Sequence, residues 1–78
     1  MWCVYIVQCS DQTLYTGISN NVAKRVDAHN KGKGAKYTKT RRPVVLLKQF
    51  ECPDRSSASK LEYKIKQMTR KQKLALIS

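Results

Sequence analysis

Two short apolar runs separated by a polar break open the chain. Residues 2–9 and 13–16 are rich in β-branched and aromatic side chains, whereas residues 10–12 are polar. This pattern predicts a β-hairpin. Because side chains alternate between the two faces of a strand, Tyr5 and Tyr15 are expected on one side of the hairpin, as cross-strand or diagonal neighbours.

The pattern then changes to helical spacing. Asn20 or Asn21 can cap the start of a helix that continues to about Asn30, and Gly32 suits the left-handed position beyond its end. The inner face of this helix is marked by three residues at helical spacing, namely Val22, Val26 and His29.

A basic segment and a second apolar run follow. Residues 31–42 hold six basic residues and no acidic residue, so a mobile surface loop is expected there. Residues 44–50 form an apolar run without clean alternation, which predicts a strand covered on both faces.

The last third of the chain returns to helical spacing. Asp54 or Ser56 can cap a helix over residues 57–68, and Thr69 and Gln72 have the spacing of a capping box that begins a short final helix. The inward stripe of the longer helix consists of Ala58, Leu61, Ile65 and Met68. The order β-β-α-β-α-α predicts an α+β fold, with a three-stranded mixed sheet flanked by helices. We expect a single domain over residues 1–78.

The charge of the chain narrows the class of partner. Sixteen Lys and Arg residues against five acidic residues give the 78-residue chain a formal net charge of +11. The excess predicts a polyanionic partner, with nucleic acid first and an anionic membrane surface second. No segment approaches the ~20 apolar residues that span a bilayer, and residues 1–9 do not have the features of a signal peptide. We therefore expect a cytoplasmic protein without membrane association.

The cysteines and the acidic residues argue against two kinds of metal site. The three cysteines include no CxxC pair and the chain has one His, so free, buried thiols are expected rather than a structural zinc site. Most acidic residues are dispersed, which argues against the carboxylate cluster of a two-metal nuclease. The cysteines are Cys3, Cys9 and Cys52, and the dispersed acidic residues are Asp11, Asp27, Glu51 and Asp54.

Five residues are candidates for chemistry, and each has a structural alternative. Glu62 faces partly inward on its helix, where a carboxylate needs either a cationic side chain or a metal ion. Arg25 and His29 lie one turn apart and form either a phosphate site or an Arg beside a packed His. Tyr5 and Tyr15 are either a packing pair or a chemical pair, and a chemical role requires a lowered phenol pKa.

These positions together resemble a known family. Tyr5 ends the run Cys3-Val4-Tyr5, and ten residues later Tyr15 begins Tyr15-Thr16-Gly17, which resembles the paired signature of the GIY-YIG nuclease superfamily. Arg25, His29 and Glu62 follow in the order and spacing of that family. Residues 32–38 and 62–74 resemble the small stand-alone bacterial members of the UPF0213 type. The resemblance covers nearly the whole chain, although Cys3, Val4 and Thr16 depart from the signature and no Asn follows residue 30.

The resemblance implies a metal-dependent endonuclease that hydrolyses phosphodiester bonds in DNA. Tyr5 or Tyr15, as a phenolate, would take a proton from the attacking water, and Arg25 would stabilise charge on the phosphate. His29 would orient or assist, and Glu62 would hold one Mg²⁺ or Mn²⁺ ion. In this family the glycine that ends the second motif lets the backbone approach the site closely.

The expected substrate is recognised by structure or backbone, because no additional domain is present to read bases. Branched, flapped or nicked DNA is the candidate substrate, with DNA repair or recombination as the setting and a monomer or weak dimer as the active form. Phosphate contacts are expected from basic side chains, namely Lys24, Lys33, Lys36, Lys39, Arg41, Arg42, Lys64, Lys66 and Arg70. Two alternatives stay open: a non-catalytic nucleic-acid-binding module, and an RNA-directed protein.

Overall fold

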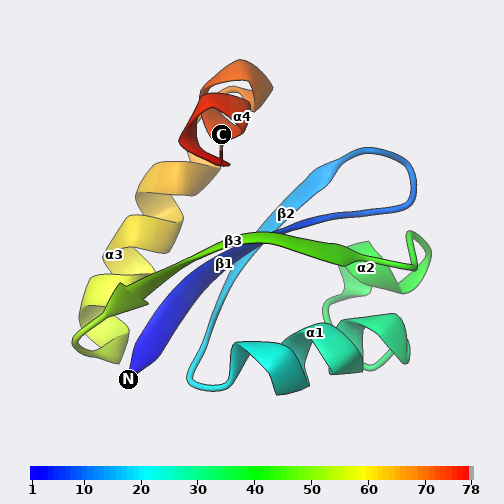
Figure 1. Ribbon diagram of the computed structural model, residues 1–78, viewed down its shortest axis with the longest axis horizontal. Coiled ribbons are helices and arrows are strands. Elements are labelled where there is room, and N and C mark those ends of the chain that lie inside the picture. The colour runs from blue at the N-terminus through cyan, green and yellow to red at the C-terminus, as the bar shows by residue number, and fades with distance from the viewer. Residues whose placement is uncertain (78) are drawn as a thin grey trace.

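The computed structural model describes residues 1–77, and over that range it contains three strands and four helices (Figure 1). The predicted α+β order is confirmed, with one addition, the short helix α2. Ser78, the last residue of the predicted single domain, lies outside the described residues. In chain order the elements are β1 (Trp2–Gln8), β2 (Leu14–Ser19), α1 (Val22–Asn30), α2 (Lys36–Lys39), β3 (Val45–Cys52), α3 (Arg55–Lys66) and α4 (Arg70–Ile77).

β1 is the central strand of the sheet, which has the order β2-β1-β3. It pairs antiparallel with both neighbours, so the expectation of a mixed sheet is wrong in this detail. β2 and β3 run in the same direction, but they form no parallel pair because β1 lies between them. The predicted hairpin is confirmed, and its turn is closed by the Cys9 amide, which donates to the Thr13 carbonyl at 2.8 Å.

The register of the hairpin fixes how the two signature tyrosines meet. Tyr5 lies opposite Gly17, and Val7 lies opposite Tyr15. Tyr15 is therefore two residues from the partner of Tyr5 and on the same face, which makes the two tyrosines diagonal neighbours. The predicted arrangement is confirmed.

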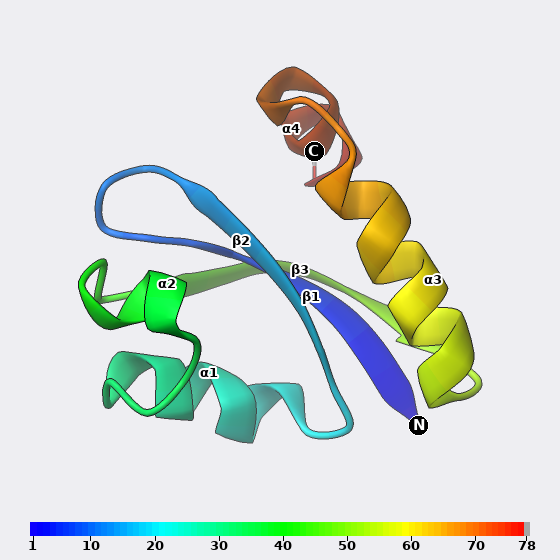
Figure 2. The same ribbon diagram turned by 180° about the vertical axis from the view of Figure 1, so that it is seen from behind.

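Helices cover both faces of the sheet. In both ribbon views α1 and α2 lie on one side of the strands, and α3 and α4 lie on the other (Figures 1 and 2). Toward α3, Val4 and Ile6 of β1 pack with the fully buried Ala58 and Ile65. Toward α1, Tyr5 and Val7 belong to a second cluster of buried side chains. Burial on both faces explains why β1 reads as an almost uninterrupted apolar run.

β3 does not have the double cover that its sequence indicated. It is an edge strand, and Val45 and Leu46 are 60% and 39% exposed. The prediction of a strand covered on both faces is wrong for β3 because the helices cover the centre of the sheet, which β1 occupies. An apolar run by itself does not distinguish a central strand from an edge strand.

The predicted helix boundaries rest on capping side chains that are all in place. The Asn21 and Asp54 side chains accept from the amides of Lys24 and Ser57 at the starts of α1 and α3. Thr69 and Gln72 bond reciprocally before α4, which confirms the capping box. Gly32, just beyond α1, has a φ of +77° and fills the expected left-handed position.

The basic segment between α1 and β3 is more ordered than a mobile loop. It contains α2, and within it the Thr38 side chain is fully buried. The prediction of a purely polar surface loop is wrong here because the Thr38 hydroxyl finds buried partners, described below. The three cysteines are free, as expected; Cys9 and Cys52 are buried, whereas Cys3 is only partly buried. Over residues 1–77, no helix has both the length and the apolar character needed to cross a membrane.

Candidate active site

Tyr5 and His29 meet at the interface between β1 and α1. Strand alternation turns Tyr5 toward α1, and the helical period of α1 turns His29 toward the sheet. Both side chains are almost completely buried, and the Tyr5 Oη lies 2.8 Å from the His29 Nε2. His29 is therefore a packed and hydrogen-bonded histidine, as its structural alternative describes. The hydrogen-bond partner of His29 is Tyr5, one of the two signature tyrosines.

The other ring nitrogen of His29 contacts the segment that includes α2. Its Nδ1 lies 2.7 Å from the Thr38 Oγ1, and the Thr38 hydroxyl donates to the Ala35 carbonyl at 3.0 Å. A hydroxyl has one proton, so with that donation the Nδ1–H donates to Thr38 and the Nε2 accepts from Tyr5. The Ala35 amide, which donates to Nδ1 at 3.3 Å, fits the other neutral tautomer. The two tautomers differ in the direction of the Tyr5–His29 hydrogen bond.

Two glycines make room for this pair. A Cβ at Gly17 would lie 2.6 Å from the Tyr5 Oη, and a Cβ at Gly34 would overlap the His29 ring. The expected close approach of the Gly17 backbone is thus directed at the Tyr5 hydroxyl. Gly34, within the basic segment, leaves the same room for the His29 ring.

Burial sets the protonation of both groups. The pKa of the Tyr5 phenol is raised, chiefly by burial, while the neighbouring Arg25 pulls it down and Tyr15 and Glu62 push it up. The pKa of His29 is lowered, first by burial and then by the Arg25 charge. The lowered phenol pKa that a chemical role required is therefore not found at Tyr5. At neutral pH the proton rests on Tyr5, and His29 is an unprotonated base beside it.

Tyr15 contacts the same histidine from β2. Its ring meets the His29 ring edge-on with centroids 5.4 Å apart. The Tyr37 ring stacks against Tyr15 with centroids 5.8 Å apart and planes inclined by 23°. The ammonium of Lys66 lies 6.0 Å from the Tyr15 ring centroid. Tyr15 is therefore surrounded by residues of α1, α2 and α3.

Glu62 lies on α3, on the other side of the sheet from α1 and α2 (Figures 1 and 2). Its side chain is 23% exposed, and one carboxylate oxygen lies 3.4 Å from the Lys66 Nζ. The structural alternative for Glu62, an ion pair with a cationic side chain, is present. It lies near Tyr15, one of the two signature tyrosines. Lys66 also contacts the Tyr15 ring, and the Glu62 charge acts on Tyr5.

A metal ion would find one protein carboxylate here. Among the described residues no group of three or more His, Cys, Asp or Glu side chains gathers at one point. Mg²⁺ is often held by one or two carboxylates, with water and substrate phosphate completing its six oxygens. A single Glu62 beside the tyrosine pair fits that pattern, and Glu62 is the residue that would hold the ion.

Arg25 lies exposed on the flank of α1. Its charge lowers the pKa values of both Tyr5 and His29. Together with Lys24 and the segment before α1 it lines a hollow of about 240 Å³. Contacts join Tyr5, Tyr15 and His29, and the charges of Arg25 and Glu62 act on the pKa of Tyr5. The assignment of all five residues to one active site stays a prediction.

The predicted phosphate-contacting residues spread over three places, of which the hollow beside α1 holds Lys24. Around α2, a hollow of about 930 Å³ is lined partly by basic side chains, while Arg42 donates to the carbonyls of Lys39 and Asn30. The set on this surface comprises Lys33, Lys36, Lys39 and Arg41. Lys64, Lys66 and Arg70 belong to α3 and α4, and all three are exposed.

Sequence reasoning missed Thr38, Ala35 and Gly34 as parts of the site. All three lie in the segment that was expected to be a mobile loop, and they surround His29. The one signal available was the likeness of residues 32–38 to small stand-alone family members, which gave no role to any residue within the run.

Comparison with known proteins identifies the family of the chain. The family model described as the GIY-YIG catalytic domain matches residues 1–75. The chain belongs to the GIY-YIG family. This membership places it in a superfamily of nucleases, which act on nucleic acid, typically with a divalent metal ion.

Proteins named UPF0213 are similar over nearly the whole chain. UPF0213 protein DP2720 of Desulfotalea psychrophila is 56% identical over 77 residues, which cover 97% of this chain and 70% of that protein. UPF0213 protein SH2523 of Staphylococcus haemolyticus is 57% identical over 74 residues, which cover 95% and 90%. The solution NMR structure of UPF0213 protein BH0048 from Bacillus halodurans is 38% identical, with a TM-score of 0.63, and the match covers 99% of this chain and 83% of that one.

Proposed function

We propose that the protein is an endonuclease that hydrolyses phosphodiester bonds in DNA, with Tyr5 and His29 as a proton-accepting pair. The observation that carries the proposal is the 2.8 Å contact between the Tyr5 Oη and the His29 Nε2. A buried phenol beside an unprotonated imidazole can pass its proton on as it takes one from water. Of the two signature tyrosines, Tyr5 has this contact, so Tyr5 is the proposed base.

In the proposed step a water molecule attacks the phosphorus. In the tautomer with its proton on Nδ1, the His29 Nε2 takes the Tyr5 proton while the Tyr5 oxygen takes one proton from the water. The bond from phosphorus to the leaving sugar oxygen breaks, and that oxygen takes a proton from solvent. Arg25 stabilises the negative charge that develops on the phosphate oxygens. Tyr15, against the His29 ring, orients the water and the phosphate.

Glu62 would hold one Mg²⁺ or Mn²⁺ ion, and such an ion supplies positive charge next to the leaving oxygen. Lys66, whose Nζ lies 3.4 Å from Glu62, would have to release the carboxylate for such an ion to bind there. The Lys66 ammonium, together with the basic side chains of α2 and α4, would then contact backbone phosphates. These contacts recognise the DNA backbone without reading sequence, which is why branched, flapped or nicked DNA is the proposed substrate.

Two observations favour a second candidate function. Glu62 is occupied by Lys66 and the pKa of Tyr5 is raised, and both facts suit a module that binds nucleic acid without cleaving it. Binding of DNA and RNA of matched shape, without strand cleavage under any metal condition, would favour this alternative.

The test is incubation with flapped, branched and linear DNA in Mg²⁺ or Mn²⁺. Wild type is expected to cleave, and Glu62→Ala to keep its affinity for DNA while losing about 10²-fold or more in rate. Tyr63→Phe is the matched control, because Tyr63 lies on the same helix and is 69% exposed. Cleavage by Glu62→Ala at the wild-type rate would overturn the metal role.

A further inference from the structure

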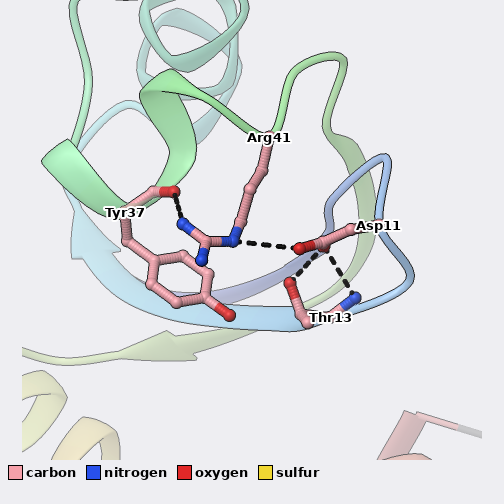
Figure 3. Close-up of polar contacts among 4 residues, drawn as sticks. All are labelled: Asp11, Thr13, Tyr37 and Arg41. Carbon is pink, nitrogen blue, oxygen red and sulfur yellow. Dashed lines mark hydrogen bonds and ion pairs between the residues drawn. The ribbon is translucent and has the colours of Figure 1, made fainter.

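Arg41 links the hairpin turn to the α2 segment. Its Nε donates to the Asp11 Oδ2 at 3.0 Å, and its Nη1 donates to the Tyr37 carbonyl at 2.8 Å (Figure 3). Its guanidinium carbon lies 4.2 Å from the centroid of the Tyr37 ring. One planar group thus bonds an acid from one segment and covers an aromatic ring from another.

The acid of this link is itself fixed. The Asp11 Oδ1 accepts from both the amide and the hydroxyl of Thr13 (Figure 3). These bonds, and then the interaction with Arg41, hold the pKa of Asp11 below its usual value. The Ser10 amide adds a backbone bond to the Arg41 carbonyl at 2.9 Å. The turn between β1 and β2 and the segment after α2 are therefore joined at two points, the Arg41–Asp11 bond and the Ser10–Arg41 backbone bond.

The ring that Arg41 covers has Tyr15 as its other neighbour. Tyr37 is stacked against Tyr15 at 5.8 Å, so its ring contacts both a fixed cation and a signature tyrosine. Tyr15 lies on β2, an edge strand of the sheet, and the strand alone does not fix the rotation of its side chain. Tyr15 contacts the Tyr37 ring as well as the His29 ring, so the stack is a contact that can limit that rotation.

We propose that Tyr37, fixed by Arg41 and Asp11, is a positioning residue that holds Tyr15 in place against His29. The inference rests on the proposed function, since it assigns the three residues a purpose at the same site. Catalysis depends on alignment to within a fraction of an ångström, and a stacked ring fixed by a guanidinium with two hydrogen-bond partners can provide that alignment. A residue that only recruited phosphate would need neither the stack nor the bond to Asp11.

The test pairs Tyr37→Ala with Tyr37→Phe, which keeps the stack, and with Asp11→Asn, which removes the charge on the acid. Tyr63→Ala is the control, because Tyr63 is an exposed tyrosine outside this cluster. The first readout is NMR of the ring protons of Tyr15 in the intact protein, which requires no cleavage activity. The Tyr15 resonances are expected to lose their ring-current shift and broaden in Tyr37→Ala, to stay at wild-type positions in Tyr37→Phe, and to broaden less in Asp11→Asn.

The second readout separates positioning from substrate binding. In Tyr37→Ala the kcat for DNA cleavage is expected to fall by ~3–10-fold, as loss of an aromatic pair predicts, with KM changed less than ~2-fold. Tyr37→Phe is expected to restore kcat. An unchanged Tyr15 spectrum in folded Tyr37→Ala, or a rise in KM with kcat retained, would overturn the proposal. If wild type cleaves nothing, the proposed function fails, and the NMR comparison still decides whether Tyr37 holds Tyr15.

Discussion

The Tyr5 Oη lies 2.8 Å from the His29 Nε2, and the two side chains are 1% and 0% exposed. The two residues are 24 positions apart in the sequence, one on a strand and the other on a helix. Each polar group can be buried because the other supplies its hydrogen-bond partner. A phenol with a raised pKa and an imidazole with a lowered pKa are thereby held together in their neutral forms.

This pairing predicts a specific pH dependence for cleavage. His29 must be unprotonated, and because its pKa lies below about 6.5, kcat/KM is expected to fall only in mild acid. Tyr5 keeps its proton to above about 10, so kcat/KM is expected to stay level between these limits. A rate that instead rises tenfold per pH unit from 7 to 10 would mean that a free phenolate is the base. The measurement is kcat/KM from pH 5 to 10 at constant ionic strength.

The same pKa shift predicts how stability depends on pH. Since the folded pKa of His29 lies below the unfolded value of about 6.5, the unfolded chain binds the proton first. The His29 contribution is therefore fully present above about pH 6.5 and is lost as pH falls toward the folded pKa. Urea denaturation at pH 5 and 7 should give a smaller loss in His29→Gln than in wild type. An equal loss in both proteins would contradict this assignment.

Removing the Thr38 hydroxyl should disturb His29 from its far side. Thr38→Val leaves the His29 Nδ1 without the partner at 2.7 Å, so a loss of about 1–3 kcal/mol in the free energy of unfolding is expected. The rate of DNA cleavage should fall as well, because the imidazole is no longer fixed in orientation. Thr38→Ser keeps the hydroxyl and is expected to recover most of both quantities, measured by chemical denaturation and by cleavage rate. Wild-type values in Thr38→Val would rule out a role for the hydroxyl.

A methyl group at Gly17 should act directly on Tyr5. A Cβ there would lie 2.6 Å from the Tyr5 Oη, so Gly17→Ala is expected to displace the phenol and to cost about 1–3 kcal/mol in stability. Cleavage is expected to fall further than the stability loss explains. Gly32→Asn is the control: its Cβ would meet the end of the Arg42 side chain, which can move, and Asn tolerates the left-handed backbone. Full activity in Gly17→Ala would show that Tyr5 needs no fixed position.

Lys66 should compete with a metal ion for Glu62. Because the Lys66 ammonium neutralises that carboxylate at 3.4 Å, Lys66→Met is expected to bind Mn²⁺ more tightly, by about 2–5-fold for an ion pair of partly exposed groups. Lys64→Met, two positions away on α3, is the matched control and should leave Mn²⁺ affinity nearer to the wild-type value. Isothermal titration of Mn²⁺ into each protein measures the difference. Equal affinities in wild type and Lys66→Met would mean that the ion does not bind at Glu62.

The parts of the fold that rest on local chemistry could be predicted from the sequence. Asn21, Asp54 and the Thr69–Gln72 pair mark helix starts because their side chains bond nearby amides. The diagonal pairing of Tyr5 and Tyr15 follows from strand alternation and a short turn. The parts that failed depend on neighbours distant in sequence. The apolar run of β3 gives no sign that the strand lies at an edge, and the basic segment gives no sign that Thr38 is buried against His29.

The candidate site divides in the same way. The order of Tyr5, Tyr15, Arg25, His29 and Glu62 is a sequence pattern, so the family resemblance could name all five. The hydrogen bond between Tyr5 and His29, the stack of Tyr37 on Tyr15 and the Glu62–Lys66 pair are tertiary contacts. The pKa of Tyr5 could not be anticipated either, since burial outweighs the cations that the composition supplies.

The central claim, that Tyr5 is the proton acceptor for the attacking water, is tested most directly by Tyr5→Phe. The measurement is the single-turnover rate of cleavage of flapped DNA with Mg²⁺, at protein concentrations where wild type and variant bind the DNA equally. The account predicts cleavage by wild type and a fall of ~10²–10⁴-fold in Tyr5→Phe, as expected for loss of a general base. Equal rates in the two proteins would contradict it.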